Sequence, residues 1–263
     1  MKENPILKLF NDHPSVQSLI NAISDGTHRI KAEGICGSLK ALVIASAFIR
    51  SQVTHLVVVP EKEDAAYLYN DLVALAGEEN IFFFPSTYKR SVLYEQTEPA
   101  NIVLRTEVLN HLSSGKRKGI IVSYPESVME KVISRSNLKK STLGIAVGEK
   151  LSTGFIEEVL NEYGFLRVDF VYEPGQYSVR GSIVDIFSFS SDLPFRIDFF
   201  GDEVETIRSF NTEDQLSVKI LDKIQVIPNI QDITLGELSD SFIDFLPPSG
   251  IIWIEDAGFI TDK

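Results

Sequence analysis

The sequence predicts an α/β fold in which a parallel-sheet lobe carries an inserted, smaller α+β domain with an antiparallel sheet. In the first half of the chain, short apolar strands alternate with helices, which is typical of a parallel sheet covered on both faces. In the second half, strands follow one another through tight turns, which is typical of an antiparallel sheet. A last apolar strand near the end of the sequence returns to the first pattern.

The first half contains apolar strands separated by amphipathic helices. The predicted strands are 29–35, 55–59, 81–84 and 119–123, and the predicted helices are 41–50, 65–75 and 104–112. Pro60 and Pro85 each end a strand, and Gly77 supplies a C-terminal stop for the second helix. Because ligands of such sheets bind at the carboxyl ends of the strands, the loop after the first strand is the expected place for a nucleotide.

The second half changes character near residue 134. A helix at 155–163 has Ser152 or Thr153 as its cap and Gly164 as its stop. The strands that follow are 166–170, 177–180, 182–187, 195–200 and 203–210, and Gly201-Asp202 forms a two-residue hairpin turn. A strand at 224–227, a short helix at 242–246 and a strand at 251–254 complete the chain. The predicted domain limits are 1–133 for the first part of the lobe, 134–212 for the inserted domain and 213–263 for the return segment.

The loop after the first strand resembles a phosphate-binding loop that has lost two functional residues. Residues 34–41 are G-I-C-G-S-L-K-A, against the pattern G-x-x-x-x-G-K-[ST]. Gly34 and Lys40 match, but Leu39 replaces the second glycine and Ala41 replaces the hydroxyl residue that binds Mg²⁺. An ordinary strand, turn and helix with two glycines explains the motif equally well, so both interpretations stay open.

Two carboxylates follow the last strand in the order Glu255-Asp256, the reverse of the Asp-Glu pair of helicases. The reversal displaces each carboxylate by about one methylene, which matters in a site that needs ångström-level placement. Taken alone, the pair is more simply two charges that leave a strand for solvent. Together with the damaged loop, it indicates that both halves of one nucleotide site were lost and that a separate domain lies between them. The residues of this degenerate site are Gly34, Gly37, Ser38, Lys40, Glu255 and Asp256.

Composition argues against several functional classes. The net charge is −12, and the only short basic runs are 116–118 and 139–140. Because nucleic-acid affinity depends on Lys and Arg that neutralise phosphates, the chain is a poor DNA binder by itself. The single cysteine, Cys36, excludes a disulfide framework and a cysteine-based zinc site. The four histidines show no metal-ligand or triad spacing. Without a signal peptide or an apolar run of membrane length, we expect a cytoplasmic chain with no membrane partner.

A long signature in the second half resembles one shared by the excinuclease protein UvrB and the bacterial transcription-repair coupling factor. Residues 180–187 are R-G-S-I-V-D-I-F, and residues 194–208 are P-F-R-I-D-F-F-G-D-E-V-E-T-I-R. The resemblance covers nearly the whole chain. It implies a helicase-like lobe with a degenerate P-loop and an inserted domain that binds the damage-recognition protein UvrA.

Three features favour the coupling factor over UvrB. UvrB has an intact P-loop, and this chain does not. UvrB also carries a long aromatic-rich β-hairpin that threads damaged DNA, and residues 86–98 are too few to form it. Residues 210–217, F-N-T-E-D-Q-L-S, resemble the coupling-factor stretch F-D-x-x-T-Q-R-S. Members of that family are several times longer, so this chain is expected to be a truncated piece.

The resemblance implies a non-catalytic module that mimics UvrB and recruits UvrA to a lesion where RNA polymerase has stalled. The lobe would pack against the remainder of its own polypeptide. No cofactor is implied in this segment, because ATP and Mg²⁺ belong to a DNA translocase motor elsewhere in the family protein. RNA polymerase and double-stranded DNA are likewise bound by other domains.

The UvrA-contacting residues carried over by position are Arg167, Arg180, Phe187, Arg196 and Arg208. Phe187 is equally compatible with a place in the core. Arg196 and Arg208 lie near several carboxylates, so internal ion pairs are expected. Counting alternate residues places Arg180 on the sheet face opposite Phe187.

The competing function is a weak nucleotide- or DNA-binding helicase-like domain with residual ATP binding, in which Lys40 still meets a phosphate. Hydrolysis would require Gly and Ser/Thr at positions 39 and 41. A DNA-binding module would require a basic groove lined by aromatic residues. The nearest approach to such a groove is the set Tyr88, Lys89, Arg90 and Tyr94.

Overall fold

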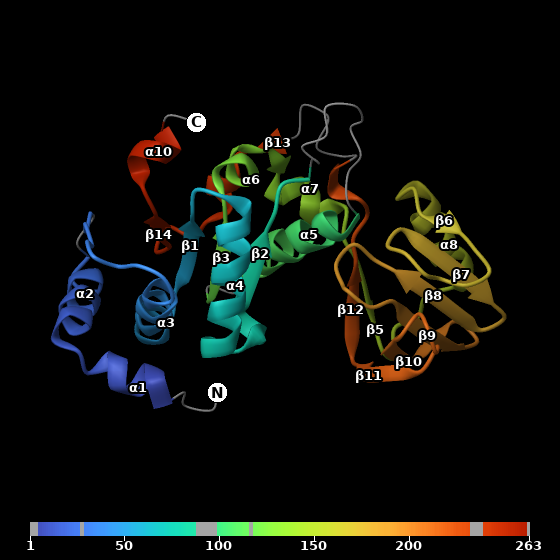
Figure 1. Cartoon of the computed structure of the whole chain (residues 1–263). Coiled ribbons are helices and arrows are strands. Elements are labelled where there is room, and N and C mark those ends of the chain that lie inside the picture. The colour runs from blue at the N-terminus through green and yellow to red at the C-terminus, as the bar shows by residue number, and fades with distance from the viewer. Residues whose placement is uncertain (1–4, 27–28, 88–98, 116–117, 232–238, 262–263) are drawn as a thin grey trace. The chain divides into compact units, whose positions relative to one another are not determined.

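The computed structural model describes residues 5–26, 29–87, 99–115, 118–231 and 239–261 (Figure 1). Two compact units divide the chain: unit 1 comprises Met1–Ser86, Ser114–Glu130 and Phe242–Lys263, and unit 2 comprises Thr87–Ser113 and Lys131–Ser241. The units reflect compactness, so the predicted domain limits at residues 134 and 212 stay a prediction. The set Tyr88, Lys89, Arg90 and Tyr94 lies outside the described residues.

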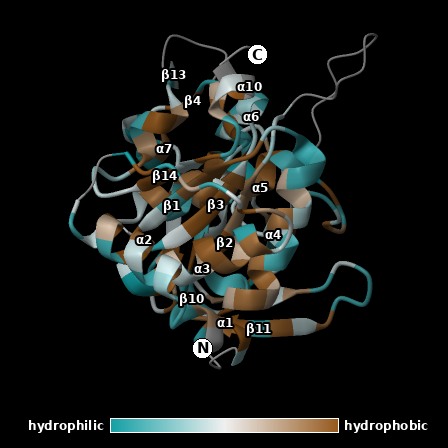
Figure 2. Ribbon diagram, turned by 60° about the vertical axis from the view of Figure 1, so that its left-hand side comes forward, coloured by the Kyte–Doolittle hydropathy of each residue, from teal (hydrophilic) through white to brown (hydrophobic). Residues whose placement is uncertain are grey.

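Unit 1 is built on a four-stranded parallel sheet in the order β14-β1-β3-β2. Its strands are β1 (Thr54–Val58), β2 (Ile81–Phe84), β3 (Gly119–Ser123) and β14 (Ile251–Ile254). β1 and β3 are buried along their whole length, which explains why their sequences are mostly apolar (Figure 2). The prediction of a parallel sheet with these four strands is confirmed.

Unit 1 also contains helices. They are α1 (Pro5–Asn11), α2 (Pro14–Ser24), α3 (Leu39–Ser51), α4 (Lys62–Ala76), α6 (Pro125–Met129) and α10 (Ala257–Thr261), with 3₁₀ turns η1 (Glu78–Asn80) and η2 (Phe242–Phe245). Of these, α4 packs on the sheet, and α1 and α2 pack on α3. α3 and α4 share a buried cluster with one face of the sheet, in which Phe48 and Leu72 meet Val57 and Val122. The predicted helices at 41–50 and 65–75 are confirmed, and Gly77 ends the second with a φ of 82°.

Two predictions in unit 1 are wrong. Residues 29–35 do not form a strand but an irregular, mostly exposed segment. Within the described residues the sheet ends at β14, and the alternating polar and apolar residues of 29–35 do not pair with that edge. The predicted helix at 242–246 is the 3₁₀ turn η2, which Pro247 and Pro248 follow directly.

Unit 2 contains a six-stranded sheet in the order β11-β10-β9-β8-β7-β6. The strands are β6 (Leu166–Arg167), β7 (Gln176–Arg180), β8 (Ile183–Phe187), β9 (Phe195–Phe200), β10 (Glu203–Phe210) and β11 (Ser217–Leu221). Every pair is antiparallel except β6 with β7. Gly201 has a φ of 63° in the β9–β10 turn, which confirms the predicted hairpin. The predicted strand at 166–170 is shorter than expected, and β11 was not predicted because four of its five residues are exposed.

Helix α8 (Thr153–Glu162) covers one face of this sheet. Ser152 Oγ accepts a hydrogen bond from the backbone N–H of Phe155, so Ser152 is the cap. Tyr177 Oη donates to Asn161 Oδ1 at 3.0 Å, and Leu160 is fully buried. The sheet residues on this face form the core of unit 2; Val184, Ile186, Ile197 and Ile207 are each 0% exposed.

The remaining elements of unit 2 are short apart from one helix. They are α5 (Pro99–Ser113), β4 (Val132–Ile133), α7 (Arg135–Lys140), β5 (Leu143–Ala146), β12 (Lys223–Val226) and β13 (Ser239–Asp240). β12 pairs with β5, and β13 pairs with β4. The predicted helix at 104–112 and strand at 224–227 are confirmed as α5 and β12. No helix in the described parts of the chain is both long and apolar enough for a membrane span.

Candidate functional site

The loop before α3 holds the first part of the predicted nucleotide site. Gly34 and Gly37 have φ angles of 78° and 56°, in the left-handed region that glycine adopts without strain. The backbone N–H groups of Leu39 and Lys40 donate to the carbonyl oxygens of Cys36 and Gly37 at 3.3 and 3.2 Å. A phosphate-binding loop directs such N–H groups at an anion. Here the loop's own carbonyl oxygens accept them.

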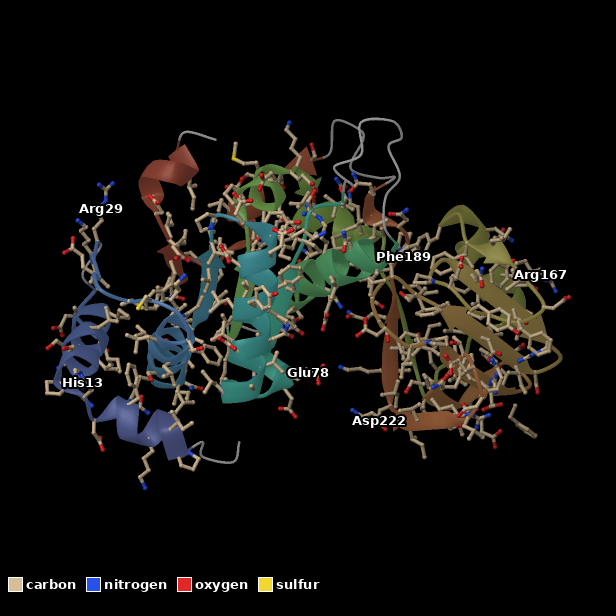
Figure 3. All side chains as sticks on the ribbon, in the orientation of Figure 1. His13, Arg29, Glu78, Arg167, Phe189 and Asp222 are labelled. Carbon is tan, nitrogen blue, oxygen red and sulfur yellow. The ribbon has the colours of Figure 1, made fainter. Side chains whose placement is uncertain are left out.

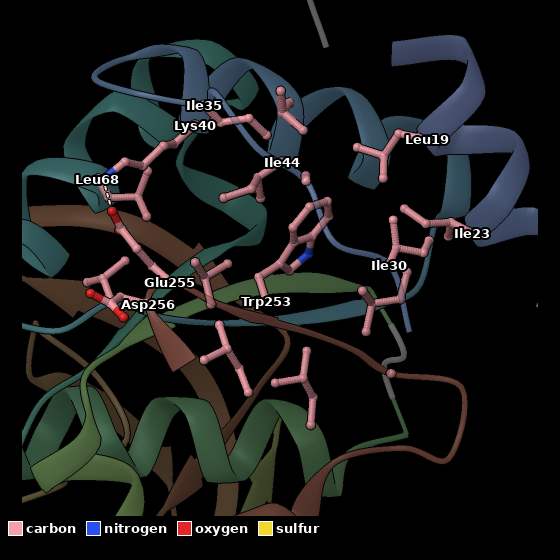
Figure 4. Close-up of a pocket in the computed structure, with 18 of the residues that line it drawn as sticks. Leu19, Ile23, Ile30, Ile35, Lys40, Ile44, Leu68, Trp253, Glu255 and Asp256 are labelled. Carbon is pink, nitrogen blue, oxygen red and sulfur yellow. Dashed lines mark hydrogen bonds and ion pairs between the residues drawn. The ribbon is translucent and has the colours of Figure 1, made fainter. Parts of the chain in front are cut away.

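Lys40 and Glu255 meet in an ion pair, so the structure brings together the two ends of the predicted site (Figure 4). The Lys40 side chain is 30% exposed and that of Glu255 is 34% exposed. Ser38 is the N-cap residue of α3, but its side chain makes no capping hydrogen bond. Asp256 follows in a left-handed conformation with a φ of 48°. The ammonium group that would contact a phosphate is therefore neutralised by a carboxylate of the same chain.

A cavity of about 560 Å³ lies beside this ion pair in unit 1 (Figure 4). Much of its wall is apolar and comes from α2, the segment 29–35, α3 and β14. These side chains include Leu19, Ile23, Ile30, Ile35, Ile44 and Trp253. Polar side chains, among them Lys40, Glu255 and Asp256, complete the wall. The cation among these three is already paired with Glu255, whereas a nucleotide site needs several convergent donors for the phosphates.

His55 in β1 is a structural residue of unit 1. Its Nδ1 accepts a hydrogen bond from Trp253 Nε1 at 3.0 Å, so Nε2–H donates to Ser51 Oγ at 2.8 Å. Burial lowers the pKa of His55 to about 4, because the charged imidazolium would lose its hydration. The imidazole is therefore neutral near pH 7, and its role is to pack and hydrogen-bond inside unit 1. Within the described residues, no group of three or more His, Cys, Asp or Glu side chains is arranged to hold a metal ion.

The second candidate site is the face of the six-stranded sheet opposite α8. Asp185 pairs across the strands with Arg196, and Arg196 pairs with Arg208. Arg180 pairs with Ile183, which lies two residues from Asp185 on β8 and therefore on the same face of the sheet. Because cross-strand partners project to the same face, the three arginines and Asp185 form one row over β7, β8, β9 and β10. We call this surface the arginine face.

Asp185 organises the row. Its side chain is 1% exposed and accepts from Arg196 Nε at 2.7 Å, from Arg196 Nη2 at 2.8 Å and from Arg180 Nη2 at 2.5 Å. The hydrogen bonds to Asp185 raise the pKa of Arg196. A buried carboxylate is tolerated only with such compensation. Asp185 was not predicted as a site residue, although cross-strand pairing of the two signature segments could have found it.

Two aromatic rings support the arginines. The guanidinium carbon of Arg180 lies 4.8 Å from the ring centroid of Phe170, and that of Arg196 lies 4.3 Å from the ring centroid of Phe210. Phe210 is buried, whereas Phe170 is 48% exposed. Arg180 and Phe170 therefore present a stacked cation–π pair to solvent.

The structure separates the other predicted residues. Arg208 pairs with Asp198 at 3.1 Å, so the expected internal ion pairs of Arg196 and Arg208 are confirmed. Arg167 projects outward from unit 2 (Figure 3) and pairs with Glu157 of α8 at 2.8 Å. Its strand partner is Tyr177, which faces α8, so Arg167 does not lie on the arginine face. Phe187 is only 7% exposed, so its side chain is buried although it does not lie on the α8 face of the sheet.

The predicted placement of Arg180 and Phe187 on opposite faces is wrong. The prediction counted alternate residues straight through the turn at Gly181-Ser182. In the hairpin, Arg180 pairs with Ile183 and Gln176 pairs with Phe187. Gln176 and Arg180 share a face of β7, so Arg180 and Phe187 share a face of the sheet.

A protein-family model matches this part of the chain. Residues 143–231 match the protein-family model of the UvrB interaction domain. The matched range runs from β5 through β12 and contains the whole arginine face.

Longer proteins of two kinds are similar to most of this chain. The transcription-repair-coupling factor of Bacillus subtilis (strain 168) is 28% identical over 213 residues, which are 81% of this chain and 18% of that protein. The coupling factor of Haemophilus influenzae is 29% identical over 76% of this chain and 17% of its own length. UvrABC system protein B of Thermotoga petrophila is 25% identical over 86% of this chain and 36% of its own length. The resemblance predicted from the signature is confirmed, and the chain spans less than a fifth of these coupling factors.

Proposed function

We propose that this chain is a non-catalytic, UvrB-mimicking module of a transcription-repair coupling factor and that its UvrB interaction domain recruits UvrA in transcription-coupled nucleotide excision repair. The whole protein would be an ATP-dependent DNA translocase that displaces stalled RNA polymerase. RNA polymerase and double-stranded DNA would be bound by domains outside this chain. The observation that carries the proposal is the arginine face, which lies entirely within the matched residues 143–231.

The geometry of the arginine face suits a protein partner. Arginines and aromatic residues dominate the energetics of protein interfaces, and an arginine held in place loses less entropy on binding. Arg180 is held by Asp185 and Phe170 and still leaves 36% of its side chain exposed. Its free N–H groups can form charge-assisted hydrogen bonds with a carboxylate of UvrA.

The geometry of unit 1 supports a lobe without catalysis. We propose that it is a degenerate P-loop helicase-like lobe that takes neither ATP nor Mg²⁺ and packs against the remainder of its own polypeptide. Lys40 is paired with Glu255, and the first N–H groups of α3 are bound by the loop. Leu39 and Ala41 occupy the positions that a functional loop gives to glycine and to a metal-binding hydroxyl.

Calorimetric titration of purified UvrA into the chain tests the proposal. Wild type should bind saturably, and Arg180→Ala should weaken binding by about 2 kcal/mol, or roughly thirtyfold in Kd. Arg29→Ala removes an exposed arginine from unit 1 and serves as the matched control, with no change expected. Arg167→Ala then reports whether the α8 side of the domain also contacts UvrA. No saturable binding by a folded wild-type chain would overturn the proposal.

A further inference from the structure

Two large apolar side chains on the arginine face are almost fully exposed. Phe200, at the end of β9, and Ile220, in β11, are each 81% exposed. Arg196, Asp198 and Phe200 alternate along β9 and therefore share a face. Ile220 pairs with Arg208 across β10 and β11, so it projects to the same side.

These residues flank the arginine row. Phe200 precedes the β9–β10 turn, and Ile220 lies on β11, the edge strand of the sheet. Val218 of β11 is also 60% exposed, and the Phe170 ring that supports Arg180 is 48% exposed. Scattered exposed apolar residues need no explanation, but several on one sheet face mark an interaction surface.

The arginine row alone offers a partner little free charge. Asp185 accepts hydrogen bonds from both Arg180 and Arg196, and Asp198 pairs with Arg208. Paired charges contribute less long-range attraction than free ones, so apolar burial is expected to add to the binding free energy that Arg180 supplies.

We propose that Phe200 and Ile220 are apolar anchors of the arginine face and insert into apolar depressions on UvrA. This inference rests on the proposed function. The occupant is UvrA because both residues continue the surface that carries Arg180 and Arg208, and all four lie within the matched residues 143–231. The partner surface is accordingly apolar, with carboxylates placed between its depressions to meet Arg180.

The test is the affinity of the chain for UvrA, measured by calorimetry for wild type, Phe200→Ala and Ile220→Ala. Each variant should bind at least about tenfold more weakly, because burial of a whole Phe or Ile side chain contributes that much or more to affinity. Phe155→Ala is the matched control, since Phe155 lies on α8, covers the opposite face and is 44% exposed. Its affinity should stay within about twofold of wild type. The thermal unfolding midpoints of the Phe200 and Ile220 variants should match wild type, because both side chains are exposed.

The outcomes separate the inference from the proposed function. If wild type binds and Arg180→Ala weakens binding, but the Phe200 and Ile220 variants bind like wild type, the anchors are refuted and the recruitment role stands. Equal losses in Phe155→Ala and Phe200→Ala would also refute the assigned face. Absence of binding by folded wild type would overturn both. Selective loss in the two anchor variants, with a more negative heat capacity change for wild type than for either, would support the inference.

Discussion

Replacing Asp185 with asparagine should destabilise unit 2 by about 2–3 kcal/mol. Removing one partner of a buried ion pair costs about 3–5 kcal/mol, because the remaining charge is left uncompensated. Asparagine keeps the shape and one acceptor, and Arg180, whose side chain is 36% exposed, can turn towards solvent. Both effects reduce the loss. Arg196 is only 14% exposed and cannot turn towards solvent. Most of the loss in stability therefore arises from its guanidinium group, which remains buried without its carboxylate partner.

Urea denaturation of the two proteins measures this penalty as a shift of the midpoint at constant slope. Asp198→Asn is the matched control, because Asp198 is 20% exposed and pairs with Arg208 at 3.1 Å. A partly exposed pair contributes about 1 kcal/mol or less. Equal shifts for the two variants, or a loss below about 1 kcal/mol for Asp185→Asn, would refute the view that Asp185 organises the arginine row. Weaker UvrA binding by folded Asp185→Asn should accompany the loss.

Three further predictions concern the rest of the chain. Because the pKa of His55 is about 4 when folded and near 6.5 when unfolded, the unfolded state binds more protons between these values. The free energy of unfolding should therefore fall by roughly 3 kcal/mol from this group as pH decreases from 6.5 to 4. His55→Gln should lose that pH dependence in urea titrations. An unchanged dependence would contradict the view that buried, neutral His55 causes it. Mg-ATP should give no saturable heat with wild type or with Glu255→Gln, which frees Lys40, because the loop amides stay occupied; saturable binding by wild type would show that the site still functions. Ser152→Ala should cost about 1 kcal/mol of unfolding free energy through loss of the α8 cap, and Thr153→Ala should cost less; the reverse order would mean that the cap is assigned to the wrong residue.

Elements that carry their own local signal could be predicted from the sequence. β1 and β3 are mostly apolar because both of their faces are buried, and the β9–β10 hairpin is indicated by its turn residues, Gly201-Asp202. The cap at Ser152 and the stop at Gly77 were likewise found from local chemistry.

Features that depend on a distant partner could not be predicted in this way. Residues 29–35 have a strand-like pattern, but a strand also needs a neighbour to accept its hydrogen bonds. The sheet face on which Arg180 and Phe187 lie depends on how the turn at Gly181-Ser182 sets the strand register. Counting alternate residues along the sequence does not account for that turn. Asp185 became visible as the centre of the site only when the pairing of β8 with β9 brought it beside Arg196.

The exposed strand β11 and the exposed side chain of Phe200 were not predicted for a different reason. β11 has four exposed residues, so no buried face imposes a regular apolar pattern on its sequence. Phe200 lies in a strand that alternates as expected, but periodicity cannot tell which face of a sheet remains uncovered. The position of α8 shows which face is covered. Tyr177 donates a hydrogen bond to Asn161 of α8, so α8 lies on the face opposite Phe200.

Hydrogen exchange of the chain with and without saturating UvrA tests the central claim most directly. A partner bound on the arginine face would shield the bordering loops from solvent and restrict their opening, so exchange of their amides should slow. The account predicts slower exchange at 168–175, 201–202 and 211–216, with little change in the loop at 34–38 of unit 1. Protection confined to unit 1, or none at all with UvrA in excess, would contradict the proposal that the UvrB interaction domain recruits UvrA through this face.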